Sequence, residues 1–229
     1  HIYTLPTENY VRYVGYAVSM TEWIIFARIV YTWRSSVTEA QKFFHYFPYR
    51  FLLAADVWVL INLGQGLLMS IPALNIYTHG THVTVAHAMG TTIGINTMIA
   101  LAACFEFFKG RCESANWRPR LNTFFWLTQV SLAVFFLALN TAGVYRGIWQ
   151  MGDRAIPFRT LMHQLQPAFY VFVFAGVLLM TALGGLSYAL LRRYFKCDWK
   201  TGGARARIIN LKRHEQLIGT PRSNVSERA

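Results

Sequence analysis

Charged side chains are scarce in this 229-residue chain: they make up 14% of it, while hydrophobic residues make up 54%. Soluble domains carry about 25% charged residues, so the composition excludes an ordinary soluble protein. Among the charged residues, the acidic ones are fewer, with 10 Asp and Glu against 22 Lys and Arg, and the formal net charge is +12. Such a charge would suggest nucleic acid as a partner of a soluble protein. Here the basic residues lie beside long apolar segments, so we expect no nucleic-acid partner.

Cysteine is also rare. The sequence contains Cys104, Cys112 and Cys197 without a CxxC pair, so nothing indicates a disulfide framework or a zinc site, and we assign these thiols no role. The chain opens with His1, and its first residues show neither the charged region nor the cleavage site of a signal peptide. We therefore expect that further sequence precedes His1.

Long apolar runs dominate what remains. A bilayer core of about 30 Å needs roughly 20 apolar helical residues, and about five stretches meet this length: Tyr10 to Trp33, Arg50 to Ala73, Val83 to Phe108, Leu121 to Trp149 and Leu161 to Tyr194. The sequence predicts an all-α, polytopic transmembrane bundle over residues 1–195, followed by a basic tail over residues 196–229.

The distribution of Lys and Arg predicts the orientation of this bundle, because short cytoplasmic loops carry the excess of positive charge. With the N-terminal end outside, few basic residues fall on the outer side, namely Arg12, Arg146, Arg154 and Arg159. The opposite orientation would place most of the Lys and Arg outside. We therefore expect the tail to lie in the cytoplasm, where it also meets anionic lipid headgroups.

Ionisable groups within a membrane span are expensive and are therefore functional candidates. Glu22 lies in the middle of the first stretch, Asp56 lies in the second and His87 lies in the third. Arg28 offers Asp56 an ion-pair partner, which would be a structural explanation of both residues. Glu22 has no such neighbour in the sequence.

The densest group of candidate ligands is the segment Ile76 to Ile99, IYTHGTHVTVAHAMGTTIGINTMI. On a helix, His87 and Met89 are about 200° apart and project to opposite faces. One helix could thereby ligate two haem irons, since histidine and methionine are both axial ligands of haem. The alternative is structural: His87 hydrogen-bonds a neighbouring helix and Met89 packs.

Three patterns, YTHG, AHAMG and LNTAGVYRGIW over Leu139 to Trp149, together resemble the later helices of the catalytic subunit of bacterial nitric oxide reductase, in the haem-copper oxidase superfamily. The resemblance extends to about Cys197 and corresponds to the end of the seventh helix through the twelfth. It implies haem b, high-spin and low-spin, and a non-haem iron as cofactors. It also implies a cytochrome c-type subunit or quinol as electron donor, the rest of the catalytic subunit as partner, and the bacterial cytoplasmic membrane as location.

The same resemblance implies roles for four residues. His87 matches the ligand of the high-spin haem iron. Met89 stands where the family has a second histidine, the ligand of the low-spin haem, and thus departs from the pattern. His1 falls on the second histidine of a pair that binds the non-haem iron, and Glu22 falls on a catalytic glutamate that faces or ligates this iron. The remaining ligands would lie upstream, so this chain alone assembles neither metal centre.

The implied reaction converts two NO molecules, two electrons and two protons into N₂O and water. Two other classes of protein stay open at this point. One is another haem-copper-type enzyme, such as an oxygen reductase or an NO-dismutating relative. The other is a helical membrane subunit without catalytic activity.

Overall fold

The computed structural model describes residues 8–38, 41–42, 45–108, 118–152 and 156–196. This part of the chain is helical and contains no strand, which confirms the all-α prediction. Its elements are α1 (Asn9–Ser36), α3 (Tyr46–Ser70), α4 (Pro72–Thr78), α5 (His82–Met89), the π-helix η2 (Gly90–Thr97), α6 (Met98–Phe107), α7 (Arg118–Met151) and α8 (Phe158–Lys196). His1 and the predicted tail beyond Lys196 lie outside the described residues.

Four helical segments are long and apolar enough to cross a membrane: α3, the continuous rod His82–Phe107 formed by α5, η2 and α6, α7, and α8 up to Arg192. These segments match four of the five predicted stretches to within a few residues. The remaining predicted stretch, which is the first in the sequence, is α1. Its 28 residues are also long enough to cross a bilayer. Arg12, Glu22 and Arg28 interrupt its apolar character, and α1 is not among the four.

The second predicted stretch ends earlier than expected, because Pro72 starts a separate short helix. Proline lacks a backbone N–H and is favourable in the first turn of a helix, and here it opens α4 after a break at Ile71. Gly80 follows with a φ of 69°, so it provides the left-handed turn between α4 and α5. Thr81 then caps α5, as its Oγ1 accepts a hydrogen bond from the Val83 N–H at 3.3 Å.

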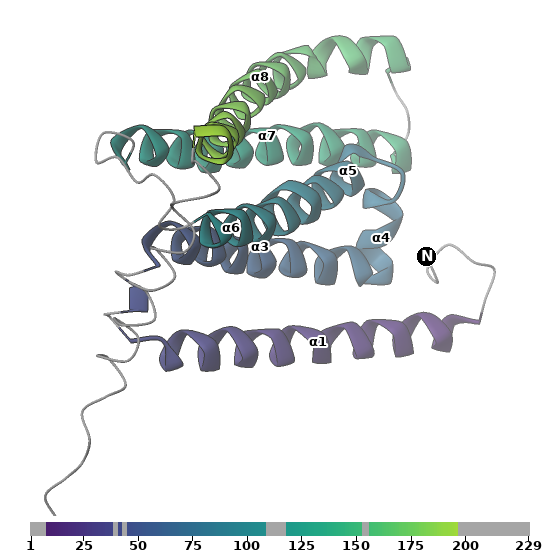
Figure 1. The fold of residues 1–229 in the computed structure, drawn as a ribbon. Helices are drawn as coiled ribbons and strands as arrows, with labels where there is room; N and C mark the ends of the chain where they lie inside the picture. The colour runs from purple at the N-terminus through teal and green to yellow at the C-terminus, as the bar shows by residue number, and fades with distance from the viewer. Residues whose placement is uncertain (1–7, 39–40, 43–44, 109–117, 153–155, 197–229) are drawn as a thin grey trace, which may run out of the picture.

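The helices run roughly side by side, with α7 and α8 on one side of the bundle, α1 on the other, and α3 and the α5–η2–α6 rod between them (Figure 1). The rod contacts α7 through α5 and α3 through η2 and α6. Among the described elements, helix α1 packs mainly on α3, and it has no buried residue. Helix α8 curves over α7 and contains Pro167, which removes one helical hydrogen bond.

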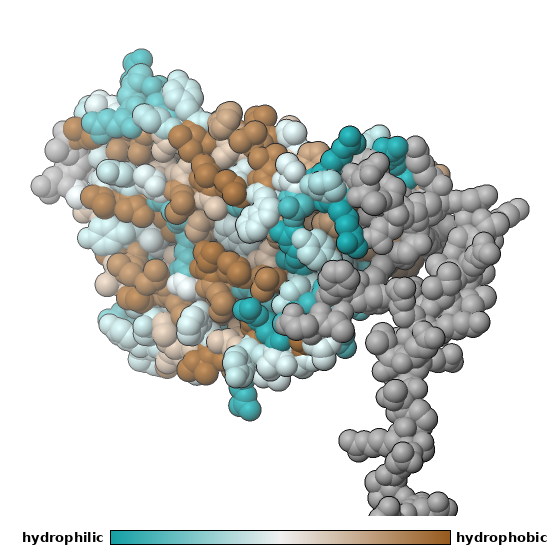
Figure 2. All heavy atoms as spheres, turned by 90° about the vertical axis from the view of Figure 1, so that its left-hand side faces the viewer, coloured by the Kyte–Doolittle hydropathy of each residue, from teal (hydrophilic) through white to brown (hydrophobic). Residues whose placement is uncertain are grey.

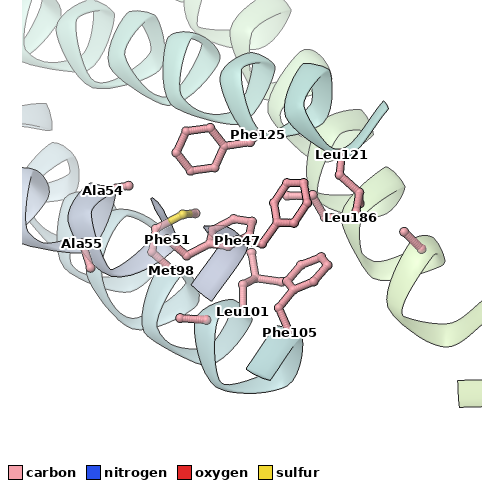
Figure 3. Packing of buried hydrophobic residues seen from close by; sticks show 12 residues of the cluster. Phe47, Phe51, Ala54, Ala55, Met98, Leu101, Phe105, Leu121, Phe125 and Leu186 are labelled. Atoms are coloured by element: carbon pink, nitrogen blue, oxygen red, sulfur yellow. The ribbon is translucent and has the colours of Figure 1, made fainter. Parts of the chain in front are cut away.

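An aromatic cluster joins the helix ends that the sequence places toward the cytoplasm (Figure 3). Phe51 is fully buried and lies 5.3 Å from Phe105 of α6 and 5.2 Å from Phe125 of α7, measured between ring centroids. Leu186 brings α8 into the same cluster. Lipid tails are as apolar as these side chains, so the cluster stabilises the bundle by close packing rather than by removing surface from water. Figure 2, which looks at these ends, shows hydrophobic side chains interspersed with polar ones on the face that it presents.

At the opposite end of the bundle, α7 approaches α4 and α5 through glycines. A Cβ on Gly143 would overlap the backbone nitrogen of Val83, and a Cβ on Gly147 would overlap the carbonyl oxygen of Tyr77. Small residues spaced four apart let membrane helices approach at the backbone level. The start of the rod that carries His87 is therefore fixed by α7.

We expect Gly147→Ala to lower the free energy of unfolding by about 1–3 kcal/mol, because the Tyr77 backbone cannot yield to the methyl group as a flexible side chain would. Gly184→Ala is the matched control, since a Cβ there meets nothing within 4 Å. Thermal unfolding in detergent, followed by circular dichroism, measures both. Equal midpoints for the two variants would contradict the backbone contact at Gly147.

Candidate functional site

The imidazole of His87 lies between α5 and α3. A Cβ added to Gly66 would stand 3.1 Å from the His87 Cε1 atom, so the absence of a side chain at Gly66 makes room for the ring. The ring is half-buried, and its Nδ1 atom is buried and makes no hydrogen bond within 3.5 Å, although the backbone of Asn62 interacts with the ring. A buried polar atom without a partner is uncommon and calls for an explanation. A bound group or a water molecule would provide one.

Three residues after His87 in the sequence, the backbone changes from α-helix to π-helix at Gly90. A π-helix pairs each residue with the fifth one along, and such segments occur frequently at functional sites. The carbonyl groups at the junction receive side-chain donors: Thr91 donates to the His87 oxygen at 3.2 Å, and Thr92 donates to the Ala88 oxygen at 2.9 Å. The two threonines thus stabilise the transition immediately after the candidate ligands.

Helix α3 reinforces this junction through Asn62. Its side chain is only 3% exposed, and its Nδ2 donates to the Thr91 hydroxyl at 2.5 Å. Asn62 Oδ1 lies so close to Gly90 that a Cβ there would be 2.5 Å away. A relay of hydrogen bonds therefore runs from Asn62 through Thr91 to the carbonyl of His87. Hydrogen bonds of this kind also join helices within a bilayer.

Further polar pairs connect α3 to α7 on either side of Asn62. Gln65 donates to Asn140 Oδ1 at 2.6 Å and to the Val83 carbonyl at 3.3 Å, so it joins α3, α7 and α5. Nearer the aromatic cluster, Trp58 donates to Gln129 Oε1 at 3.0 Å. The sequence analysis did not find these residues. Their polar identity within apolar stretches was a signal, but the partners were not evident from one sequence.

Met89 is the last residue of α5 and is half-buried. His87 and Met89 both lie before the π-helix begins, so the angle of about 200° between them holds. Because His87 faces Gly66 of α3, Met89 projects away from α3. The two candidate ligands therefore point to different sides of the rod.

Glu22 lies at the middle of α1 and is exposed. Within the described residues, no three His, Cys, Asp or Glu side chains converge in a way that could hold a metal ion. Glu22 and His87 thus do not share a metal-ligating cluster in this part of the chain. The predicted iron ligand His1 lies outside it.

One polar group differs from what the sequence suggested, and another forms a contact that the sequence did not indicate. Asp56 forms no ion pair with Arg28, and its Oδ2 atom is buried without a hydrogen-bond partner. His45, which precedes α3, pairs with Glu106 of α6 at 2.8 Å between Nδ1 and Oε2. This contact joins residues 61 positions apart and closes the α3–α6 pair at the helix ends.

The model of the family Cytochrome C and Quinol oxidase polypeptide I matches residues 1–179 of the chain. The match covers more than half of the sequence, and the chain belongs to this family, the first subunit of the haem-copper oxidases. A search among curated proteins gave no match. Members of the family are membrane oxidoreductases that usually bind haem and work with other subunits and an electron donor.

Among the described residues, the surroundings of the His87 ring are those expected of a haem ligand. A histidine that ligates a metal through one ring nitrogen usually donates the N–H of the other to a backbone carbonyl or a similar acceptor, and the backbone of Asn62 interacts with the His87 ring. The hydrogen-bond relay from Asn62 through Thr91 holds the backbone carbonyl of His87. Such support from outside the ligand set is usual for haem and metal ligands.

We expect Gly66→Ala to shift the His87 ring, because its Cβ would press on Cε1 at 3.1 Å. The Soret absorption of the purified enzyme and its haem-to-protein ratio should change. Gly64→Ala, two residues earlier on the same helix, meets nothing within 4 Å and should leave both unchanged. Identical spectra for the two variants would show that the position of the His87 ring does not matter for haem binding.

Proposed function

We propose that this chain is the C-terminal part of a nitric oxide reductase catalytic subunit, which converts two NO molecules, two electrons and two protons into N₂O and water. The observation that carries the proposal is the carboxylate of Glu22, halfway along α1 and at the spacing from His1 that the resemblance requires. A carboxylate within a membrane span is costly unless it serves a polar site.

His87 would hold the high-spin haem iron, and Met89 the low-spin haem iron, on the other side of the rod. The Asn62–Thr91 relay would keep His87 in place, and Gly66 leaves the space for its ring. When bound, the high-spin haem and the non-haem iron supply the binding sites for NO and deliver the electrons. The electron donor would be a cytochrome c-type subunit or quinol.

Glu22 and His1 would serve the non-haem iron. Histidine and carboxylate together form a site suited to iron, whereas the oxidases use histidines alone to bind copper. Glu22 would either ligate the iron or carry protons to the bound substrate. Both roles require that α1 turns Glu22 toward the part of the subunit outside the described residues. The exposed position of Glu22 is compatible with this arrangement.

The surroundings follow from the same proposal. The enzyme would lie in the bacterial cytoplasmic membrane, with the rest of the catalytic subunit packed on α1 and with the basic residues 196–229 in the cytoplasm. The excess of Lys and Arg at the predicted inner ends of the helices supports this orientation.

A second candidate is an oxygen reductase, which the description of the matched family favours. The two functions differ in the gas consumed and the product formed. Purified enzyme supplied with a reductant should produce N₂O from NO at a higher rate than it consumes O₂. The reverse ratio would favour the oxygen reductase.

Glu22→Gln should reduce NO turnover by about 10² or more, since loss of a proton carrier or of electrostatic help costs this much. Both haem spectra should stay intact, because the substitution conserves shape. Glu8→Gln, at the N-cap of the same helix, should retain turnover. Turnover within about twofold of wild type for Glu22→Gln would remove this residue from the mechanism.

Met89→His should lower the reduction potential of the low-spin haem, because imidazole stabilises ferric iron more than a thioether does. Near-infrared magnetic circular dichroism of the ferric enzyme separates histidine–methionine from two-histidine ligation, and the variant should show the latter. A two-histidine band in the wild type, or no low-spin haem at all, would mean that Met89 only packs.

A further inference from the structure

A groove of about 260 Å³ separates α3 from α7 at the ends where both helices begin. One face of α3 lines the groove with Arg50, Leu53, Ala54 and Val57. One turn of α7 lines it with Phe125, Trp126 and Gln129. The two helices are bridged here by long side chains, with Arg50 hydrogen-bonded to Asn122 at one end and Trp58 to Gln129 at the other. The groove thus runs along an exposed side of the pair for about two helical turns.

Arg50 closes the groove at the predicted cytoplasmic end. Its guanidinium carbon lies 4.4 Å from the Phe125 ring centroid, 5.5 Å from that of Trp126 and 5.3 Å from that of Tyr46. Its Nη1 atom donates to the Tyr46 hydroxyl at 2.9 Å and to Asn122 Oδ1. The rings and these two hydrogen bonds hold the guanidinium in one position.

All of these partners are neutral, and no carboxylate pairs with Arg50 in the part of the chain that the structure describes. A guanidinium stays charged at any physiological pH. An uncompensated charge at the edge of the bilayer attracts an anion, and the nearest anions there are lipid phosphates. Nη2 and Nε make no hydrogen bond with the described residues, so they are available to phosphate oxygens in the bidentate manner typical of arginine.

The rest of the groove is apolar and accessible. Val57 is 49% exposed and Trp126 is 55% exposed, so an acyl chain can lie against both. Tryptophan is itself typical of the headgroup level of membranes. We infer that this groove binds an anionic phospholipid, with its phosphate on Arg50 and one acyl chain along Leu53, Val57 and Trp126.

The chemistry of the lining excludes quinol as the occupant. Oxidation of a quinol releases protons and needs a nearby base, usually a carboxylate or histidine. Among the described residues, no carboxylate or histidine lines the groove, and arginine cannot accept a proton. The inference is independent of whether the enzyme reduces NO or O₂.

The test compares lipid retention by the purified enzyme in mild detergent that contains equal amounts of phosphatidylglycerol and phosphatidylcholine. Native mass spectrometry should show phosphatidylglycerol retained in preference, and Arg50→Gln should lower its retention about tenfold, as expected for loss of a charge-assisted contact. Arg159→Gln, which removes a charge at the start of α8 near the other end of the bundle, should change nothing. Inorganic phosphate in large excess should not displace the lipid.

A fluorescence measurement keeps the test valid if Arg50→Gln proves unstable. Phosphatidylglycerol brominated in its acyl chains should quench Trp126, and the difference between wild type and Trp126→Phe isolates this contribution. Quenching of Trp126 should be stronger with this lipid than with brominated phosphatidylcholine. Equal retention or quenching by the two lipids, displacement by inorganic phosphate, or unchanged retention in Arg50→Gln would each overturn the lipid site.

Discussion

The contact between the backbones of α7 and of the α4–α5 corner determines where the candidate haem ligand stands. Gly143 and Gly147 leave no space for a side chain at this contact, so α7 packs directly on the backbone of α4 and of the beginning of the rod His82–Phe107. The aromatic cluster around Phe51 fixes the other end of the rod. Asn62 holds the middle, at the point where the helix type changes. His87 is therefore placed by three contacts, none of which involves its own ring.

These three contacts differ in physical kind, which suits a protein surrounded by lipid. The glycines provide proximity, the aromatic rings provide dispersion contacts, and Asn62 provides a hydrogen bond. In water, burial of apolar surface would dominate the stability of such a bundle. In a bilayer this term is nearly absent between helices, so shape and polar pairing must supply the specificity. The ladder of Trp58, Asn62 and Gln65 along α3 supplies the polar part.

Most of the fold could be predicted from the sequence, because hydropathy and length are direct consequences of the bilayer. The break at Pro72 and the turn at Gly80 follow from the backbone restrictions of these two residues. The π-helix could not be predicted, since the change in hydrogen-bond register does not alter the hydropathy of the sequence. The pairing of Asn62 with Thr91 depends on how two helices face each other across 29 positions of sequence, which one sequence does not show. For Glu22, the proposed iron ligand His1 lies outside the described part of the chain, so the proposed role follows from the spacing of the two residues in the sequence.

The π-helix also bears on how this span compares with a uniform α-helix of the same length. Each residue of Gly90–Thr97 bonds to the fifth residue along, as the Thr97 hydroxyl also does when it reaches the Thr92 carbonyl. Such a segment accommodates one residue more than an α-helix that spans the same distance, because each turn is wider. Deleting one residue there would restore the α-helical register and leave α6 in about the same orientation relative to His87, whereas the same deletion in a regular α-helix would rotate it by about 100°. Relatives with a regular helix at this position would therefore align with a gap of one residue in this segment, although their histidine and their aromatic cluster superimpose.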